Sequence, residues 1–480
     1  MNYSVVFFVL GWIIRLEGLL MLLPTFTGFV YHEPGGFVFL GTAVACLLVG
    51  SLITHFKPEN KQVYMRDGFV SVGLAWLVMS LIGAIPFVII GDIPNYVNAL
   101  FETVSGFTTT GSSILTEVES LSRAGLVWRS FSHWIGGMGV VVFMLAVIPL
   151  LGGTTLNLMK AESPGPVVGK LMPRIRQSAA VLYIIYLAIT VTELIMLLIF
   201  GMPPFEALCH TFGTVGTGGF GVLNDSYMSY SPALRNITTF FMLLCGVNFN
   251  FYYFVLQKKV KDAFKMEEVR VYIGLVLASV LLIFLNLGNS FYSTGESLSH
   301  AFFQVGSIIT TTGYSSADFQ QWPEFSKTIL VMLMLVGACA GSTGGGMKIS
   351  RIIIIFKNIS KELQTLLHPR LFKRTKMDGV PVAHETVRAT NVFLTVYLVI
   401  LVLSVLVISL DGFDFTTNVT AVIATISNIG PGLNVVGPTG NFSEFSVLSK
   451  FVLIFDMLAG RRELFPMLLL FSVKSWRKYS

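Results

Sequence analysis

The stretch Gly106–Ser113, which reads GFTTTGSS, places three threonines beside a glycine in an otherwise apolar chain. The same three threonines and glycine return in Ser307–Tyr314, which reads SIITTTGY. Neither stretch is apolar enough to span a bilayer, and neither is charged enough to be an ordinary loop. Irregular backbone at membrane depth is tolerated only where it lines a water-filled cavity or is buried in protein. The two stretches are therefore candidates for the lining of a pore.

The composition is that of an integral membrane protein. The chain has 480 residues, of which 54% are hydrophobic and 12% charged, whereas about 25% of the residues of a soluble domain are charged. Apolar runs close to the length of a transmembrane helix recur; they include Phe37–Thr54, Val70–Ile90, Ala180–Phe200, Val271–Leu287 and Val392–Leu410. We expect an all-α polytopic membrane protein with about ten transmembrane helices.

Positive charge gathers in five stretches, and their positions predict the topology. The net charge is +6, and most lysines and arginines fall in residues 57–66, 160–176, 258–270, 348–388 and 474–478. The positive-inside rule places all five stretches, and both chain termini, on the cytoplasmic face. Each interval between the stretches then crosses the membrane an even number of times. For residues 1–56 this predicts two transmembrane helices.

The four later intervals share one pattern, in which two long apolar helices flank a shorter and more polar segment. The short segments are too short to span a membrane; they are Asn95–Phe107, Pro204–Val215, Glu296–Ile309 and Phe415–Ser427. Each ends in a small motif with a glycine, namely TTTG, VGTG, TTTG or SNIG. Such recurrence predicts an internal repeat. We expect four pseudo-repeated helix–pore loop–helix units around one central pore, formed by residues 57–159, 160–258, 259–357 and 358–480, after two extra N-terminal helices in residues 1–56.

The four glycine motifs have the composition of a cation selectivity filter. A dehydrated cation needs oxygen atoms in place of its water shell, and inward-facing backbone carbonyls supply them. Glycine adopts the required backbone angles at little cost, threonine hydroxyls add further oxygens, and the C-terminal ends of the short helices carry partial negative charge. We assign the ion-binding positions to Thr109, Thr110, Gly111, Gly216, Thr217, Gly218, Thr311, Thr312, Gly313, Asn428, Ile429 and Gly430.

Taken together, the motifs resemble those of the Trk/Ktr/HKT superfamily of bacterial, fungal and plant potassium transporters, and most closely its TrkH branch. The resemblance covers nearly the whole chain and rests on SGFTTTG, GTVGTGGFG, ITTTGY, SNIGPGLN, GACAGSTGGGMKISR and AGRRELFP. It implies a multi-pass protein of the bacterial cytoplasmic (inner) membrane that carries potassium, and also rubidium. It places the filter glycines at Gly111, Gly218, Gly313 and Gly430, and in this family glycine at all four positions implies potassium preference.

The resemblance also implies partners. TrkH-like subunits are homodimers that pair with a separate cytosolic ring of TrkA-like, Rossmann-type domains, which bind nucleotides. The longest cytoplasmic stretch, about residues 357–387, is basic, which suits an acidic partner surface or anionic membrane lipid. We expect potassium only as the transported ion, with no bound organic cofactor in this chain and no nucleic acid partner.

A glycine-dense segment interrupts the helix that follows the third motif. Five glycines fall within residues 337–346, and such a run is a poor helix former. It imitates a phosphate loop, but Met347 stands where lysine is needed and no strand precedes it. A close-packing or kink site is the bland alternative; the other is a loop that gates the pore from below the filter, as the resemblance implies. We assign the gate to Gly341, Gly344, Gly345, Gly346 and Lys348, together with Arg461.

Arg461 belongs to the motif AGRRELF, which places Arg461, Arg462 and Glu463 inside the last apolar stretch. Intramembrane charges usually face a cavity or a partner. We predict that Arg461 faces the pore as a cationic barrier, which is also the position of the family's arginine; a structural pair with Glu463 is the alternative. For Arg129 and His133, in the first unit, we expect ordinary hydrogen bonding between helices.

These observations predict potassium uptake through a channel-like pore, with a filter of four loops, an intramembrane gate and regulation by a cytosolic nucleotide-binding subunit. The alternative within transport is a symporter coupled to H⁺ or Na⁺, which the parallel orientation of the repeats and the lack of a central acidic relay disfavour. The sequence contains no His–Glu, Ser–His or paired-Asp constellation, so we do not expect an enzyme.

Overall fold

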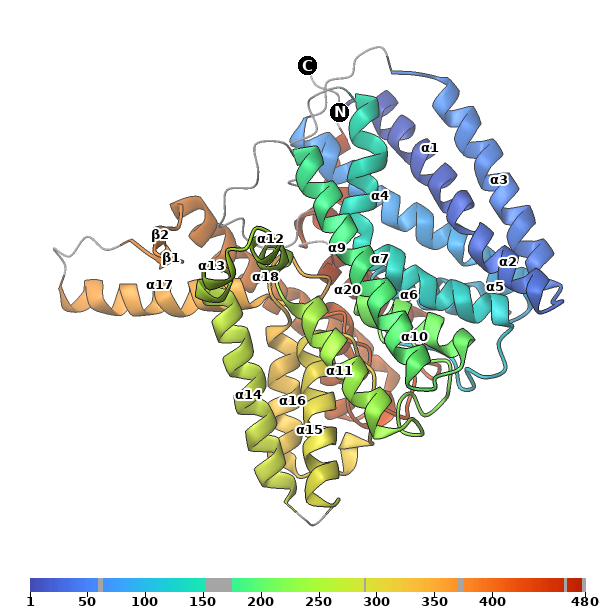
Figure 1. The fold of residues 1–480 in the computed structure, drawn as a ribbon. Helices are drawn as coiled ribbons and strands as arrows, with labels where there is room; N and C mark the ends of the chain where they lie inside the picture. Colours follow the sequence, from blue (N-terminus) through green and yellow to red (C-terminus); the bar gives the residue numbers. More distant parts are fainter. Residues whose placement is uncertain (59–63, 152–174, 289–290, 369–373, 462–463, 477–480) are drawn as a thin grey trace.

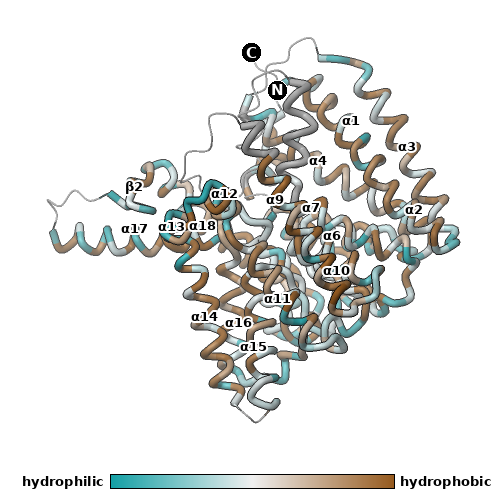
Figure 2. Tube along the Cα trace, viewed as in Figure 1, coloured by the Kyte–Doolittle hydropathy of each residue, from teal (hydrophilic) through white to brown (hydrophobic). Residues whose placement is uncertain are grey.

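The computed structural model describes residues 1–58, 64–151, 175–288, 291–368, 374–461 and 464–476, and they are almost entirely helical (Figure 1). Among these residues, six helices are long and apolar enough to cross a membrane, or seven if the bent pair α11 and α12 counts as one span. Figure 2 shows hydrophobic residues along the long helices and hydrophilic residues around α13. The predicted all-α multi-pass membrane fold is confirmed.

The two predicted N-terminal helices are present. Helices α1 (Tyr3–Leu20) and α2 (Leu22–Val30) form one span, and α3 (Gly35–His55) returns beside them. Glycine lets α1 and α3 touch: a Cβ on Gly50 would stand 2.6 Å from the carbonyl oxygen of Gly11. Small residues at such contacts are the usual means of packing helices within a membrane.

Four helical units follow, in the predicted order. The first holds α4 (Met65–Gly83), α5 (Ile85–Ile90), α6 (Tyr96–Phe107) and α7 (Arg123–Leu151); the second holds α9 (Ile175–Ile199), α10 (Pro204–Gly216), α11 (Pro232–Gly246) and α12 (Phe249–Leu256). The third holds α13 (Val260–Lys265), α14 (Glu267–Leu287), α15 (Thr294–Ile309), η1 (Phe319–Gln321), α16 (Glu324–Val336) and α17 (Ile349–Leu367). The fourth begins with the hairpin β1 (Lys376–Met377) and β2 (Val380–Pro381), and continues with α18 (His384–Ile408), η2 (Ser409–Asp411), α19 (Phe415–Ile426), η3 (Asn434–Val436), α20 (Val447–Arg461), α21 (Phe465–Leu470) and η4 (Val473–Trp476).

The four short predicted segments form the pore helices α6, α10, α15 and α19. They have 12, 13, 16 and 12 residues, fewer than the ~20 that a span requires. Side chains cap their outer ends: Asn95 accepts a hydrogen bond from the N–H of Val97 at 2.9 Å, and Asp414 accepts one from the N–H of Thr417 at 3.0 Å. Hydrogen bonds from Thr417 lower the pKa of Asp414, so this carboxylate stays charged beside the positive end of the helix dipole.

The second long helix is broken in three of the units, and our expectation of unbroken helices in units two and four is wrong. In unit two, α11 and α12 meet at an angle of 90°. In unit three, α16 ends at Val336 and α17 begins at Ile349, as the glycine run predicted; in unit four, α20 ends at Arg461 and α21 begins at Phe465. The predicted boundary at residues 357 and 358 falls inside α17, because that helix runs on to Leu367. The boundary at residues 159 and 160 lies outside the described residues.

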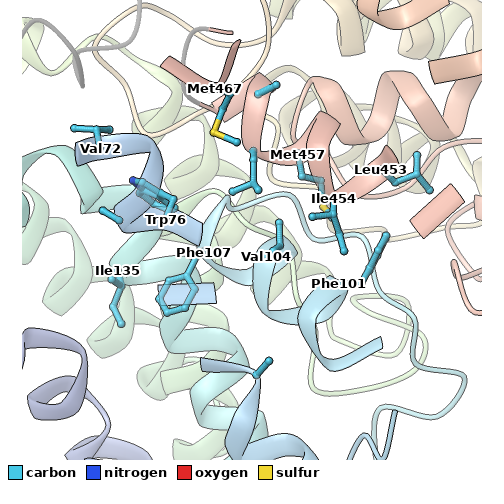
Figure 3. Close-up of a cluster of buried hydrophobic side chains, with 14 of the residues drawn as sticks. Val72, Trp76, Phe101, Val104, Phe107, Ile135, Leu453, Ile454, Met457 and Met467 are labelled. Atoms are coloured by element: carbon cyan, nitrogen blue, oxygen red, sulfur yellow. The ribbon is translucent and has the colours of Figure 1, made fainter. Parts of the chain in front are cut away.

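The first pore helix sits in the hydrophobic core. Figure 3 shows Phe101, Val104 and Phe107 of α6 among side chains from neighbouring helices, including Trp76 and Met457. The rings of Trp76 and Phe107 meet edge to face with centroids 6.4 Å apart. This packing fixes the helix that aims the first filter loop.

Candidate ion-conduction site

The four pore helices end in the same turn. The residue that leaves each helix has a left-handed backbone, with φ of 52° at Thr109, 54° at Thr217, 59° at Thr311 and 55° at Asn428. The N–H of the next residue then donates back into the helix; Gly218, for example, donates to the carbonyl of Gly213 at 2.8 Å. Four segments of different sequence therefore share one loop geometry, and their residues can be matched one to one.

This match corrects the predicted register of the second loop. Two positions after the left-handed residue stands a glycine with positive φ in every loop: Gly111 (80°), Gly219 (81°), Gly313 (88°) and Gly430 (104°). Gly218 therefore occupies the position of Thr110, and the equivalent of Gly111 is Gly219. The predicted Gly216 is the last residue of α10. The error arose because GTGG contains two adjacent glycines, and only the backbone turn distinguishes them.

The four glycines and four carbonyl groups alternate around a closed ring. A Cβ on Gly111 would stand 2.2 Å from the carbonyl oxygen of Gly218, and one on Gly219 would stand 1.8 Å from that of Thr312. The series continues from Gly313 to Ile429 at 1.9 Å, and from Gly430 back to Thr110 at 2.9 Å. Each loop therefore contacts the next one, and the fourth loop contacts the first.

Side chains join the ring between its fourth and first loops. Asn428 donates from Nδ2 to Oγ1 of Thr110 at 2.9 Å and to the carbonyl of Met457 at 2.8 Å. The hydroxyl of Ser112 donates to the carbonyl of Gly430 at 3.1 Å. Within the described part of the chain, the buried hydroxyl of Thr109 has no hydrogen-bond partner. An oxygen in that state is available to a cation.

A buried ion pair supports the outer side of loops one and two, and we did not foresee it. Arg129 of α7 lies 2.6 Å from Glu102 of α6, and both side chains are almost fully buried. Arg129 also donates to the carbonyl of Gly221 at 2.8 Å, while Glu102 accepts from the N–H of Ile114 at 3.0 Å. The pair therefore connects the segments that leave the two loops. A glutamate in a short pore helix, with an arginine in the next helix, was the available signal.

His133, one turn along α7, connects the same two loops. The N–H of Phe220 donates to Nε2 of His133 at 3.3 Å, so Nδ1 carries the proton and donates to the carbonyl of Gly106 at 2.8 Å. A Cβ on Gly218 would stand 2.1 Å from the imidazole ring. Arg129 and His133 thus do more than bond one helix to another, because both hold loop backbone in place.

The predicted gate segment forms a loop directly against filter loops three and four. The N–H of Gly345 donates to Oγ1 of Thr311 at 2.5 Å. A Cβ on Gly344 would stand 2.8 Å from the carbonyl oxygen of Thr310, and one on Gly345 would stand 2.6 Å from that of Ser427. No larger residue fits between this loop and the ends of the pore helices.

The other predicted gate residues shape the loop. Gly341 and Gly346 have φ of 66° and 76°, which glycine adopts readily. Lys348 is buried, has φ of 78°, and donates from Nζ to the carbonyl of Gly344. The structure thus brings all five predicted loop residues into one compact segment.

Arg461 joins this loop to the body of the protein. Its guanidinium donates to the carbonyl of Thr343 at 2.7 Å and to the carbonyl of Gly136 in α7 at 3.0 Å. One side chain of α20 therefore spans the loop and the first unit. The predicted alternative partner, Glu463, and its neighbour Arg462 lie outside the described residues.

Comparison with known proteins supports the same grouping. The chain matches the TrkH family, described as cation transport protein, over residues 35–478. It is 35% identical over 487 residues to the Trk system potassium uptake protein TrkH of Salmonella typhimurium, with 100% of both chains covered. It is 33% identical to the Trk system potassium uptake protein TrkG of Escherichia coli, over 97% of each chain. Its fold matches the crystal structure of the potassium transporter TrkH from Vibrio parahaemolyticus with a TM-score of 0.89 and 32% identity, over 99% of this chain and 100% of the other. The chain therefore belongs to the TrkH family of cation transport proteins.

Proposed function

We propose that this chain is a potassium-uptake pore of the cytoplasmic membrane, with both termini on the cytoplasmic side. The observation that carries the proposal is the closed ring formed by Gly111, Gly219, Gly313 and Gly430 with the carbonyls of the adjacent loops. Carbonyl oxygens at the C-terminal ends of four short helices suit a dehydrated monovalent cation. The relatives named above are potassium uptake proteins by description, which identifies potassium as the ion. The four units 57–159, 160–258, 259–357 and 358–480 are the proposed repeats.

The experiment is uptake of rubidium into liposomes that contain the purified protein, together with growth of a potassium-uptake-deficient bacterium at limiting potassium. We expect uptake and rescue from the parent chain. A folded protein that moves neither ion, with or without its cytosolic partner, would contradict the proposal.

The proposed gate is the loop at residues 337–348. Its support is the contact of Gly344 and Gly345 with the inner ends of the third and fourth pore helices, since an ion leaving the filter there meets this loop. Arg461 holds the loop tip and adds a positive charge that opposes a passing cation. We further propose that the protein is a homodimer, and that a cytosolic nucleotide-binding subunit regulates the gate from the basic cytoplasmic face.

Ion-coupled symport is the second candidate, and one observation favours it. Glu17, Glu193 and Asp456 are buried, and within the described residues each has at least one carboxylate oxygen without a hydrogen-bond partner. Buried intramembrane carboxylates are often sites of proton transfer. Rubidium uptake driven by a rubidium gradient alone distinguishes the two mechanisms. A channel-like pore supports it, whereas an obligate symporter needs a gradient of H⁺ or Na⁺ as well.

A further inference from the structure

One buried carboxylate holds both ends of the gate loop. Oε1 of Glu268, in the first turn of α14, accepts a hydrogen bond from the N–H of Ala340 at 2.6 Å and from the N–H of Ser350 at 3.1 Å. Ala340 lies where the chain enters the loop, and Ser350 lies in the first turn of α17, where the chain leaves it. The Glu268 residue is 3% exposed. A single oxygen atom therefore draws the two stems of the loop together.

The same carboxylate reaches the break in unit two. Its Oε2 accepts from Nδ2 of Asn248 at 3.2 Å, and Asn248 caps the first turn of α12 through the N–H of Asn250 at 3.0 Å. The adjacent N–H of Phe249 donates to the carbonyl of Gly341 in the loop at 3.0 Å. Glu268 thus lies where α14, the bend between α11 and α12, and the gate loop meet.

The backbone bonds at the neck of the loop are few. The N–H of Lys348 donates to the carbonyl of Val336 at 3.0 Å, and the N–H of Ile349 donates to the carbonyl of Ala338 at 3.1 Å. Hydrogen bonds to a buried ionised acceptor are stronger than bonds between neutral groups. The carboxylate at the N-terminus of α17 also interacts favourably with the dipole of that helix. The charged bonds of Glu268 are therefore the strongest polar contacts that hold the neck closed.

We propose that Glu268 is the latch of the gate, a positioning residue that keeps the loop against the filter by binding both of its stems. The inference rests on the gate function proposed above. The loop moves away from the filter when Ala340 and Ser350 separate from this carboxylate, which ties gating to the position of α14 relative to α17. Replacing the carboxylate leaves buried N–H groups without their acceptor and favours the displaced loop.

The test uses the native thiol of Cys339, which is fully buried in the loop neck, as a reporter of loop position. Cys46, Cys209 and Cys245 are changed to alanine, so that a membrane-impermeant thiol reagent applied from the cytoplasmic side reads only Cys339. Glu268→Gln is compared with the parent for both the labelling rate and rubidium uptake without a cytosolic partner. We expect both to rise by roughly tenfold, the effect of losing one hydrogen bond to a charged group.

The neighbouring residue provides a matched control. Glu267 bonds instead to Lys357 at 2.5 Å and is about one quarter exposed in its side chain, at 24%, away from the loop neck. Glu267→Gln makes the same chemical change and should leave labelling and uptake at the parent level. A second reporter, with Cys209 as the single thiol, detects general loosening, because Cys209 lies in a separate cluster with Val127 and Val222. Labelling of Cys209 should not change.

The outcomes separate the latch from the gate. Faster labelling of Cys339 with unchanged uptake supports the latch and contradicts the proposed gate function. Labelling at the parent rate in folded Glu268→Gln protein overturns the latch, whatever the uptake. Equal increases at Cys339 and Cys209 also overturn it, because Glu268 would then serve general stability. If Glu268→Gln does not fold, Glu268→Asp, which keeps the charge but is one methylene shorter, is judged by the same readouts.

Discussion

Asn428 donates a hydrogen bond from Nδ2 to Oγ1 of Thr110, over 2.9 Å, and so joins the last filter loop to the first. The two residues lie 318 positions apart in the chain. Asn428 stands where the other three loops have threonine, because asparagine tolerates the left-handed backbone at φ 55°. The ring thus closes through a residue that differs from its three equivalents.

Replacing Asn428 by glycine tests the closing bond. Glycine keeps the backbone angle without strain but removes the bonds to Thr110 and to the carbonyl of Met457. We expect a lower potassium-to-sodium permeability ratio and a loss of about 1–3 kcal/mol of stability. The control is Asn434→Gly, because Asn434 is also left-handed, at φ 56°, but lies outside the ring. Unchanged selectivity in Asn428→Gly would mean that the bond has no role in the filter.

Gly111→Ser should relax potassium selectivity. Its Cβ would stand 2.2 Å from the carbonyl oxygen of Gly218, so this oxygen must move. Gly430→Ser should have a smaller effect, because the corresponding distance, to the carbonyl oxygen of Thr110, is 2.9 Å. Permeability ratios in liposomes provide the measurement.

Gly91→Ser is the control for backbone strain in that comparison. Gly91 has φ of 91° and nothing within 4 Å of an added Cβ, so serine there adds strain without a clash. Its selectivity should equal that of the parent. Equal loss of selectivity at Gly91 and Gly111 would remove Gly111 from the filter.

Breaking the buried pair of Glu102 and Arg129 should destabilise the protein. Glu102→Gln leaves the guanidinium buried without its counter-charge, which costs about 3–5 kcal/mol. The double change Glu102→Gln with Arg129→Met should recover part of this loss, because no charge then remains buried. The half-exposed pair of Glu324 and Lys327, 2.6 Å apart, is the control, and Glu324→Gln should cost no more than about 1 kcal/mol. Thermal denaturation measures all three; additive losses in the double variant would contradict the pairing.

Arg461→Ala should raise rubidium flux in the absence of a cytosolic partner. It removes the bonds to the carbonyls of Thr343 and Gly136, and a lost bond of about 1.4 kcal/mol corresponds to roughly tenfold in rate. Arg461→Lys should lie between parent and alanine, because one ammonium group does not reproduce the fork of a guanidinium. Flux per folded protein and melting temperature are measured together. Lower stability without faster flux would identify Arg461 as a structural strut.

The local parts of this fold were predictable from the sequence, whereas the contacts between distant segments were not. The four pore helices and the break after Val336 follow from length, polarity and glycine content, which are properties of short stretches. The choice between Gly218 and Gly219 depends on which residue turns left-handed, and that residue is Thr217. The bend after Gly246 has no glycine run or proline to announce it. The pair of Glu102 and Arg129 depends on how α6 meets α7.

The most direct test of the central claim is a crystal structure of the protein grown in rubidium, with anomalous diffraction locating the ion. The ring of Gly111, Gly219, Gly313 and Gly430 predicts rubidium on its axis, bound by carbonyl oxygens of all four loops. Density there in the parent, and its loss in Gly111→Ser, is the expected result. Rubidium bound elsewhere in the membrane region, with none at the ring, would contradict the account.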